Sequence, residues 1–512
     1  MGVGLIAAMC LWSQAAWAQQ DDQDALLQRY SVVVEGDRRV IELSLAEVLA
    51  LSLERSLLLR SVRISEDIAR SGLIAAEERN NPTLTNSLGV GRSVTAFPSF
   101  GRGSRADVVT FSSKLSKTLS SGIELSATFN EERQDVGGFD ITTSGEASNF
   151  DSPTTFETSQ FTGAVSVPIF QDFGSEVNDI PVRLAEVSIR GSRNDTRQAK
   201  FDLLRTVAST YWDLVGLRET ISVEEDAVRL SQQLLEDNRQ RLRAGVVSPA
   251  DVTVSESQLA TDRQNLLEAR VGAQRIEDQV RAALNLGRLD LGLKPVEEPT
   301  LREGEFDLEA VLEKTFRNDP ALANLEQELQ RNRFELAEAL NEDDTDLDLD
   351  LAYTLKGFGK DTSDATSNLT NTDLQGYGVT LTWTVPLFDH ATAEGIRQKQ
   401  LERTQIALRV DDLKSQLTVR VQAVRRLLAL ADEEVNTARV SVSLQQELLQ
   451  NEIARFRLGE STSFQVAQIQ QDFSRARERE ILSRIRYEKI FLELLLVSGD
   501  IFAQYGLPED IP

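Results

Sequence analysis

The 512-residue chain is predicted to have an α+β fold in which very long helices alternate with groups of strands. Three observations lead to this prediction. Residues 396–458 contain neither Gly nor Pro, residues 346–353 alternate strictly between polar and apolar side chains, and the pattern of the first half returns in the second. An uninterrupted segment of that length favours one helix, and a period of two favours a strand.

A leader segment is predicted at residues 1–18. Residues 3–12 are almost wholly apolar, and Ala16-Trp17-Ala18 is a typical small-residue cleavage site. The only cysteine, Cys10, lies inside this segment, so the rest of the chain has no disulfide and no thiolate metal ligand. The true start codon and a lipid on Cys10 are left open.

Charge and hydropathy exclude two classes of protein. The net charge of −26 excludes nucleic acid as a partner, because a phosphate backbone requires a basic surface. After residue 18 there is no run of about 18 apolar residues, so no membrane-spanning helix is expected.

The two halves of the chain share segments in the same order. Residues 45–49 match 308–312 at an offset of 263, and the Val-Pro segment 167–170 matches 385–388 at an offset of 218. We therefore predict a duplication, with about 45 extra residues in the first copy (263 − 218 = 45).

Each copy reads as helix, strands, very long helix, tight turn and helix. The predicted repeats span 42–290 and 300–500, and 501–512 form a tail. Residues 396–458 would make a helix of about 95 Å with a coiled-coil seam. The shorter helices are expected near 44–79, 249–286, 306–341 and 462–498.

The strand regions are 82–170 and 346–388. In residues 346–353 the aspartates Asp346, Asp348 and Asp350 share one face, and three leucines and a tyrosine share the other. Residues 377–385 repeat this alternation after a long polar loop at 356–376. Carboxylates are costly in hydrocarbon, so the pattern predicts a closed barrel with water inside and lipid outside. Half of a soluble sandwich is the alternative.

Part of the extra length in the first copy reads as an additional β-hairpin at 109–129. Apolar and polar residues alternate on both sides of a Ser-Ser-Gly turn at 120–122. The hairpin either joins the barrel or folds over its mouth, and the sequence leaves both possibilities open.

Two matching turns follow the very long helices. Both contain an Arg-x-Arg-x-Gly segment, at 241–245 and 455–459, and the glycine suits the left-handed residue that ends a helix. Residues 248–251 and 462–465 then read as capping boxes that start the next helix.

The ordered set of these features resembles the TolC outer-membrane factor family. It comprises the helix–strand–long helix duplication, the Val-Pro-Leu-Phe-Asp segment 385–389, the Asn-Pro pair 81–82 and the two Arg-x-Arg-x-Gly turns. The resemblance implies a homotrimer that jointly forms a β-barrel in the outer membrane, in contact with its lipid. The barrel would continue as a long antiparallel coiled-coil tunnel in the periplasm. An inner-membrane transporter and a periplasmic adaptor (a membrane fusion protein) would be the partners.

The resemblance also implies two sites at the helix tips. Adaptor docking maps to Arg241, Arg243, Gly245, Val246, Ser248, Asp251, Arg455, Arg457, Gly459, Ser461 and Thr462. Where some family members narrow the channel mouth with aspartates, this chain has Gln465 and Gln468. The lumen-facing residues of the barrel would be Asp346, Asp348 and Asp350.

The predicted function is a passive exit duct for small molecules or polypeptides, of unknown cargo, with no catalytic residue, metal or cofactor. A trimeric coiled-coil surface protein is the alternative. An exported hydrolase is a third possibility, but a catalytic triad would have to use the single histidine, His390, beside a strand end.

Overall fold

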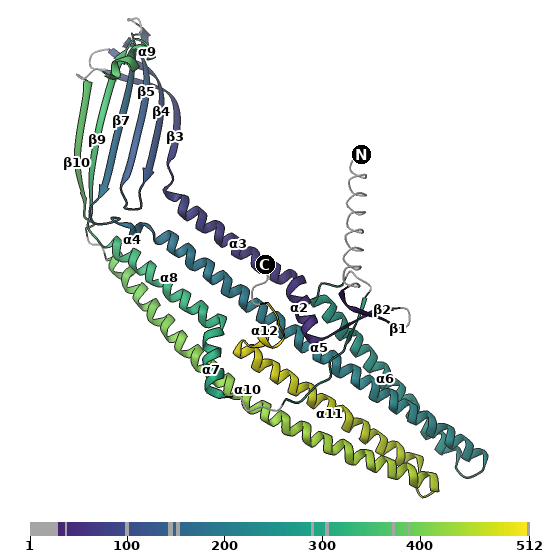
Figure 1. Cartoon of the computed structure of the whole chain (residues 1–512). Coiled ribbons are helices and arrows are strands. Elements are labelled where there is room, and N and C mark those ends of the chain that lie inside the picture. The colour runs from purple at the N-terminus through teal and green to yellow at the C-terminus, as the bar shows by residue number, and fades with distance from the viewer. Residues whose placement is uncertain are drawn as a thin grey trace, which may run out of the picture. The chain divides into compact units, whose positions relative to one another are not determined.

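We describe a computed structural model of the chain, over residues 29–35, 38–97, 102–141, 147–149, 154–287, 291–302, 307–370, 374–387 and 390–508. The predicted leader with Cys10, positions 388 and 389 of the Val-Pro-Leu-Phe-Asp segment and the last four residues of the tail lie outside these ranges. The chain divides into two compact units, and several long helices contribute residues to both. The mixture of long helices and sheets agrees with the predicted α+β class (Figure 1).

One unit, made of residues 66–191 and 326–408, is built on a large antiparallel sheet. Six long strands follow one another in the spatial order β10-β9-β7-β5-β4-β3, with the short β6 paired to β5 (Figure 1). Their bounds are Thr83–Phe97 (β3), Arg102–Thr118 (β4), Glu124–Ile141 (β5), Ala147–Asn149 (β6), Thr154–Pro168 (β7), Asp346–Gly359 (β9) and Gln375–Thr384 (β10).

The additional hairpin of the first copy is part of this sheet. β4 pairs with β3 from Thr83↔Ser116 onward, and β5 pairs with β7 from Glu124↔Ser166 onward. The question left open by the sequence is therefore answered within the chain: β4 and β5 lie between β3 and β7 and do not fold over the sheet. The hydrogen-bond register shows where the hairpin lies. The sequence of residues 109–129 alone could not show this, because it does not say which strands the hairpin pairs with.

The prediction of a long polar loop at 356–376 is wrong over much of this range. Residues 356–359 continue β9, and a short helix, α9 (Thr362–Ser367), with the 3₁₀ turn η3 (Asn368–Thr370), packs back on the strands. Gly357 permits this close approach, because a Cβ built there would lie 1.9 Å from the carbonyl oxygen of Ala365. Beneath α9, Thr362 donates to the buried carboxylate of Glu157 at 2.8 Å.

The other unit, residues 1–65, 192–325 and 409–512, is mainly helical. Two helices dominate the chain: α5 (Ile180–Arg243) and α10 (Ala391–Leu458), of 64 and 68 residues. Each is followed by a tight turn and a second helix, α6 (Pro249–Ala283) or α11 (Ser463–Ser498) (Figure 1). The remaining helices are α2 (Leu45–Arg55), α3 (Leu57–Glu77), η1 (Glu78–Asn80), α4 (Ser175–Asn178), α7 (Leu308–Asn318), α8 (Pro320–Glu342) and α12 (Ile501–Gln504).

The prediction of unbroken helices near 44–79 and 306–341 is wrong. Each is interrupted after an 11-residue helix, at Ser56 between α2 and α3 and at Asp319 between α7 and α8. Both residues are extended, with ψ near 120°, and their side chains accept a hydrogen bond from the third residue beyond them. Ser and Asp thus end one helix and cap the next, which a purely apolar periodicity does not reveal.

The core of the helical unit collects apolar side chains from α2, α5, α10 and α11. A small sheet of β1 (Ser31–Glu35), β2 (Arg38–Leu43) and β8 (Leu291–Pro295) packs into it, with β2 and β8 parallel. Tyr211 of α5 is buried there and donates to the carbonyl oxygen of Leu43 at 3.1 Å. Burial raises the pKa of this phenol, so Tyr211 remains a neutral donor.

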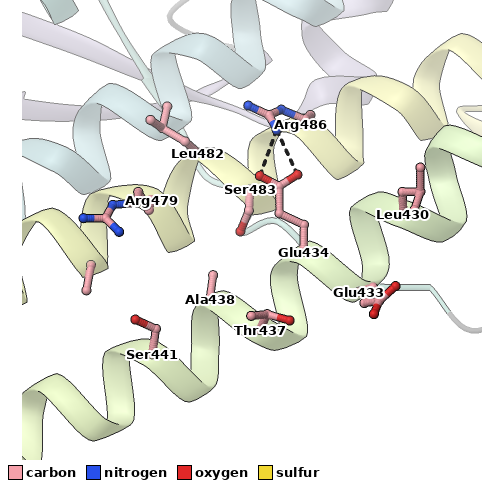
Figure 2. Close-up of a pocket in the computed structure, with 11 residues that line it drawn as sticks. Leu430, Glu433, Glu434, Thr437, Ala438, Ser441, Arg479, Leu482, Ser483 and Arg486 are labelled. Atoms are coloured by element: carbon pink, nitrogen blue, oxygen red, sulfur yellow. Dashed lines mark hydrogen bonds and ion pairs between the residues drawn. The ribbon is translucent and has the colours of Figure 1, made fainter.

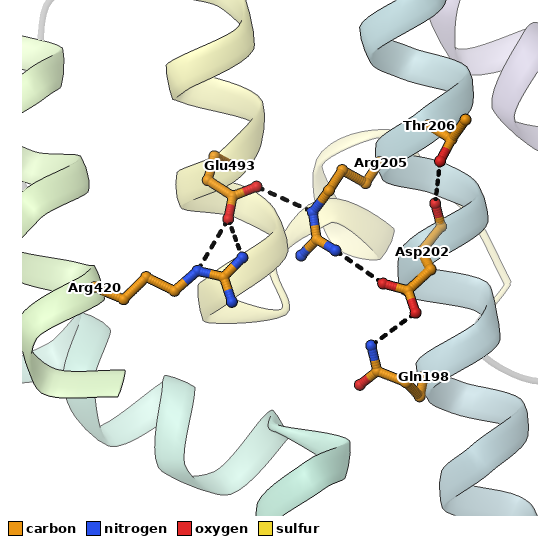
Figure 3. Close-up of polar contacts among 6 residues, drawn as sticks. All are labelled: Gln198, Asp202, Arg205, Thr206, Arg420 and Glu493. Carbon is orange, nitrogen blue, oxygen red and sulfur yellow. Dashed lines mark hydrogen bonds and ion pairs between the residues drawn. The ribbon is translucent and has the colours of Figure 1, made fainter. Parts of the chain in front are cut away.

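A polar contact links three helices of this unit (Figure 3). Glu493 of α11 accepts from the guanidinium groups of Arg205 on α5 and Arg420 on α10, both at 3.1 Å from Nε. Asp202 orients Arg205 through a second ion pair of 2.8 Å. The contact thus fixes the register between helices from both predicted repeats.

Among the described helices, none carries a stretch both long and apolar enough to cross a membrane.

Candidate functional site: the helix tips and the two-faced sheet

The two helix tips end in the same backbone motif. After α5, the amide of Val246 donates to the carbonyl of Arg241 at 2.9 Å, and after α10 the amide of Glu460 donates to that of Arg455 at 2.9 Å. Gly245 and Gly459 have φ of +72° and +81°. Both tips therefore need glycine at this position, because a residue with a Cβ is strained in the left-handed region.

The caps that follow the turns differ between the tips. Ser248 and Asp251 form the predicted capping box, and hydrogen bonds from Ser248 hold the pKa of Asp251 below its usual value. At the second tip, Thr462 accepts from the amide of Gln465 at 3.3 Å, but the reciprocal bond is absent. The prediction of a second capping box is therefore only half right, and the side chain of Gln465 is not used in the cap.

Arg241 joins the two tips to each other. Its guanidinium donates to the carbonyl oxygens of Phe456 at 2.9 Å and Arg457 at 3.4 Å, and it lies 4.3 Å from the centre of the Phe456 ring. Those carbonyls are at the end of α10, where that of Phe456 also accepts from the amide of Gly459 at 3.1 Å, so Arg241 adds a donor from outside the helix. Arg241 thus satisfies the end of a helix from the other predicted repeat.

The other predicted docking residues fall into two groups. Arg455 and Ser461 both bond to the buried carboxylate of Glu452, the first at 3.2 Å, and so hold the turn from inside. Arg243 is exposed and pairs with Glu236 at 3.3 Å, and Arg457 is also exposed. Arg455 is also exposed, with 56% of its side chain accessible, so all three arginines present charge to solvent, and Arg455 in addition holds the turn through Glu452.

Sequence reasoning missed two apolar residues at the tips. Leu458 and Phe464 are 76% and 66% exposed, and the predicted Val246 is 70% exposed. A small core lies behind them, formed by Leu234, Leu449, Phe456 and Val466. Large apolar side chains held in water on a rigid turn are typical of a contact surface. Their position in the sequence, next to Gly459 and two residues after Thr462, could have indicated that they lie at the tip.

Gln465 and Gln468 lie in the first turns of α11 with exposed side chains. The backbone amide of Gln465 donates to the capping side chain of Thr462, but the side chains of Gln465 and Gln468 take no part in the cap. Their side chains are therefore available to a neighbouring surface.

The large sheet has one apolar and one polar face. The register pairs Leu347, Leu349, Leu351 and Tyr353 of β9 with Trp383, Leu381, Val379 and Tyr377 of β10. Directly opposed residues of antiparallel strands share a face, so these eight side chains form one apolar surface. It is open to solvent: Trp383 is 68% exposed.

The same face continues over the rest of the sheet. Val165 lies between Leu351 and Leu125, and Leu115 lies opposite Leu84. Further along the strands, toward α9, the apolar residues give way to charged ones. There Arg92 pairs with Asp107, and Arg133 lies 3.7 Å from Glu157.

The opposite face carries the predicted aspartates. Asp346, Asp348 and Asp350 are paired with Thr384, Thr382 and Thr380, and Asp350 also lies opposite Ser166. The alternation predicted from the sequence is thus present in the register, with carboxylates and hydroxyls on one side of β9 and apolar side chains on the other.

A groove of about 540 Å³ runs between α10 and α11 (Figure 2). Arg486 makes a two-pronged ion pair with Glu434, at 2.8 Å for both oxygens, and small residues such as Ala438 and Ser483 form the lining. His390 is not among its lining residues, so the serine–histidine–aspartate arrangement is not assembled there. The described residues contain no group of three His, Cys, Asp or Glu side chains that could hold a metal ion.

Part of the chain matches a known protein family. A sequence model described as "Outer membrane efflux protein" matches residues 122–286, from β5 through α5 and the first tip to the end of α6. Residues 122–286 are therefore similar to the outer membrane efflux protein family. The match supports the prediction that the chain is not an enzyme, and this support does not depend on whether a catalytic site is found.

Individual relatives are distant. The chain is 25% identical over 125 residues to "Toxin and drug export protein A" of Aggregatibacter actinomycetemcomitans, which covers 24% of this chain and 27% of that protein. The match thus spans about a quarter of the relative's length.

Solved structures of outer membrane channels share the fold over nearly the whole chain. The Campylobacter jejuni CmeC outer membrane channel gives a TM-score of 0.63 at 14% identity, covering 91% of this chain and 87% of that one. The outer membrane protein VceC of Vibrio cholerae also gives 0.63, at 12% identity, covering 89% and 96%. The predicted resemblance is therefore confirmed over residues 122–286 by the family model, and over nearly the whole chain by the fold.

Proposed function

We propose that this chain is the passive outer-membrane channel component of a tripartite efflux or type I secretion system. It conducts small molecules or polypeptides from an inner-membrane transporter to the exterior. The observation that carries the proposal is the sheet with one continuous apolar face and one polar face. The family match and the names of the related channels and export protein support it.

The sheet unit suits a barrel in the outer membrane. On β9 the apolar face extends from Leu347 to Leu355, nine residues, and a strand needs about 9–11 residues to cross a bilayer. Lys117, opposite Leu125, is a charged residue within this band, and the other charged residues of this face, such as Arg92 and Arg133, lie beyond it. Six strands are too few to close on themselves, since membrane barrels start at about eight. The edge strands β3 and β10 thus pair with further copies, and we propose a homotrimer.

The helical unit suits a periplasmic tunnel built from two repeats. α5 and α10 are of similar length, and a turn containing glycine follows each of them. The helices after these turns, α6 and α11, are also of similar length, with 35 and 36 residues. The breaks at Ser56 and Asp319 are separated by 319 − 56 = 263 residues, the offset that relates residues 45–49 to 308–312. Both copies are explained by duplication of one segment that contains an interrupted helix followed by a very long helix.

The tips suit docking of a periplasmic adaptor. Val246, Leu458 and Phe464 offer exposed apolar contacts, and Arg243 and Arg457 offer exposed charges. Gln465 and Gln468 would constrict the channel mouth by hydrogen bonding between copies. Asp346, Asp348 and Asp350 would line the water-filled side of the barrel.

The first experiment is cell fractionation with an epitope-tagged chain. The protein is expected in the outer-membrane fraction as an oligomer three times the mass of the chain. Recovery only from the inner membrane or the soluble periplasm would refute the channel proposal. The coiled-coil surface protein is not favoured, because it gives no role to a two-faced sheet.

The second experiment tests docking at the tips. We expect Leu458→Ser with Phe464→Ser to reduce export at least tenfold and to weaken cross-linking to the adaptor, with assembly unchanged. Leu444→Ser is the matched control, because Leu444 is an exposed leucine of α10 away from the tip. Equal export by the double variant and the control would contradict docking at this surface.

A further inference from the structure

The number of strands differs between the two predicted repeats. The second contributes β9 and β10 between its first helix and its very long helix, whereas the first contributes β3, β4, β5 and β7 to the same sheet. The surplus is the hairpin of β4 and β5. It accounts for most of the 45 extra residues that the sequence offsets place in the first repeat.

The hairpin is paired on both sides. β3 pairs with β4 from Thr83↔Ser116 to Phe97↔Arg102, and β5 pairs with β7 from Glu124↔Ser166 to Val136↔Thr154. A flap over the mouth would instead leave β3 paired directly with β7. The strands are therefore inserted into the sheet along its length.

The hairpin also has the same two faces as its neighbours. Leu115 and Leu125 share the apolar face with Leu84 and Val165, whereas Lys114 and Glu124 share the polar face and form an ion pair at 3.4 Å. An apolar face on one side and a polar face on the other is the requirement for a strand between lipid and water, and Lys117, near the end of β4, is the exception on the apolar face.

Strand direction allows closure with this hairpin in place. All the pairings from β3 through β4, β5, β7 and β9 to β10 are antiparallel. The first and last of six alternating strands run in opposite directions, so β3 of one copy can pair antiparallel with β10 of the next. No strand has to be excluded for the ring to close.

We propose that the β4–β5 hairpin widens the exit barrel, so that three chains close an 18-stranded barrel instead of a 12-stranded one. This inference rests on the proposed outer-membrane channel. It assigns to the hairpin the role of setting the size of the cargo that can leave. The polar residues Lys114 and Glu124 then line the widened passage.

The difference in width is large. With strands about 4.8 Å apart and tilted by about 40°, a closed ring of 12 strands has a backbone diameter of about 24 Å, and 18 strands give about 36 Å. The cross-section grows about twofold. After side chains of about 5 Å on each wall, the wider barrel admits a small folded domain or several extended chains, whereas the narrower one admits extended chains or small molecules.

The test is electron cryo-microscopy of the full-length protein in lipid nanodiscs, beside a variant lacking residues 102–141. That deletion joins β3 to β7 at the end of the sheet where both already turn. We expect 18 strands in the natural protein and 12 in the variant. A natural trimer with 12 barrel strands and the hairpin outside the ring would overturn the proposal. A protein that forms no barrel would instead refute the channel function itself.

A second measurement does not depend on the variant folding. Polyethylene glycols of increasing size are added to the external side of the natural protein in a planar bilayer, and their entry is read from the drop in conductance. We expect polymers with a diameter of about 20 Å to enter. A cut-off near 14 Å, the interior expected of a 12-stranded ring, would overturn the wider barrel.

Discussion

Arg241 provides a sharp test of the tip geometry, because the sequence assigns it the same docking role as Arg243 and the structure separates the two. Arg241 donates to carbonyls at the end of α10 and stacks on Phe456, whereas Arg243 makes only an exposed pair with Glu236. We expect Arg241→Ala to loosen the tip of α10 and Arg243→Ala to affect it far less.

The magnitude follows from the contacts. A hydrogen bond from a charged donor contributes about 1.5–3 kcal/mol, and a partly exposed cation–π contact about 0.5–1 kcal/mol. Since Arg241 is only half-buried, we take about 2 kcal/mol, which is about a 30-fold change in the local opening equilibrium. The exposed pair of Arg243 contributes about 0.5 kcal/mol, or about twofold.

Amide hydrogen exchange of the last turn of α10 is the appropriate assay. The amides of Gly459 and Glu460, which bond to carbonyls of that turn, should exchange about 30-fold faster in Arg241→Ala and about twofold faster in Arg243→Ala. Equal exchange in the two variants would show that the bridge from α5 does not stabilise the tip. If the exposed charge of Arg243 contacts the adaptor, export should fall in Arg243→Ala although exchange at the tip rises only about twofold.

Three further predictions concern other parts of the chain. Gly357→Ala places a Cβ against the backbone of Ala365, so α9 must move, and limited proteolysis should cleave the 360–374 segment faster than in the natural protein. Burial and a hydrogen bond to Glu478 raise the pKa of Glu224 from 4.5 to about 7. The folded protein thus binds more protons than the unfolded chain in this window, and its stability falls as pH rises from about 4.5 to 7. Glu224→Gln should flatten that part of a plot of melting temperature against pH, and an unchanged slope would contradict the assignment. Asp319→Ala removes the cap at the start of α8, and we expect a loss of about 1 kcal/mol, read as faster hydrogen exchange in its first turn.

Much of the architecture was predictable because it depends on local patterns. Residues 396–458, most of the 68-residue α10, were predicted from the absence of Gly and Pro, and the faces of β9 follow from a period of two. The turns were predictable for the same reason, since Gly459 is needed for its own backbone angle and for no distant contact.

The site was predictable only as a location. The sequence placed a docking surface at the tips, but it could not separate Arg241, which bonds to the end of the other long helix, from Arg243, Arg455 and Arg457, which are exposed. The contact of Arg241 depends on which helices meet, and its partners Phe456 and Arg457 are more than 200 residues away. Leu458 and Phe464 were missed because an apolar residue in a helical sequence is usually buried.

The sequence by itself determined the alternation of helices and strands, the internal duplication as a hypothesis, and the positions of the turns, because each depends on residues close together in the chain. Only the tertiary structure decided that the β4–β5 hairpin lies inside the sheet and that α5 contacts the end of α10. The physical reason is that strand register and helix contacts are chosen among distant partners, whereas period and turn chemistry are properties of neighbours.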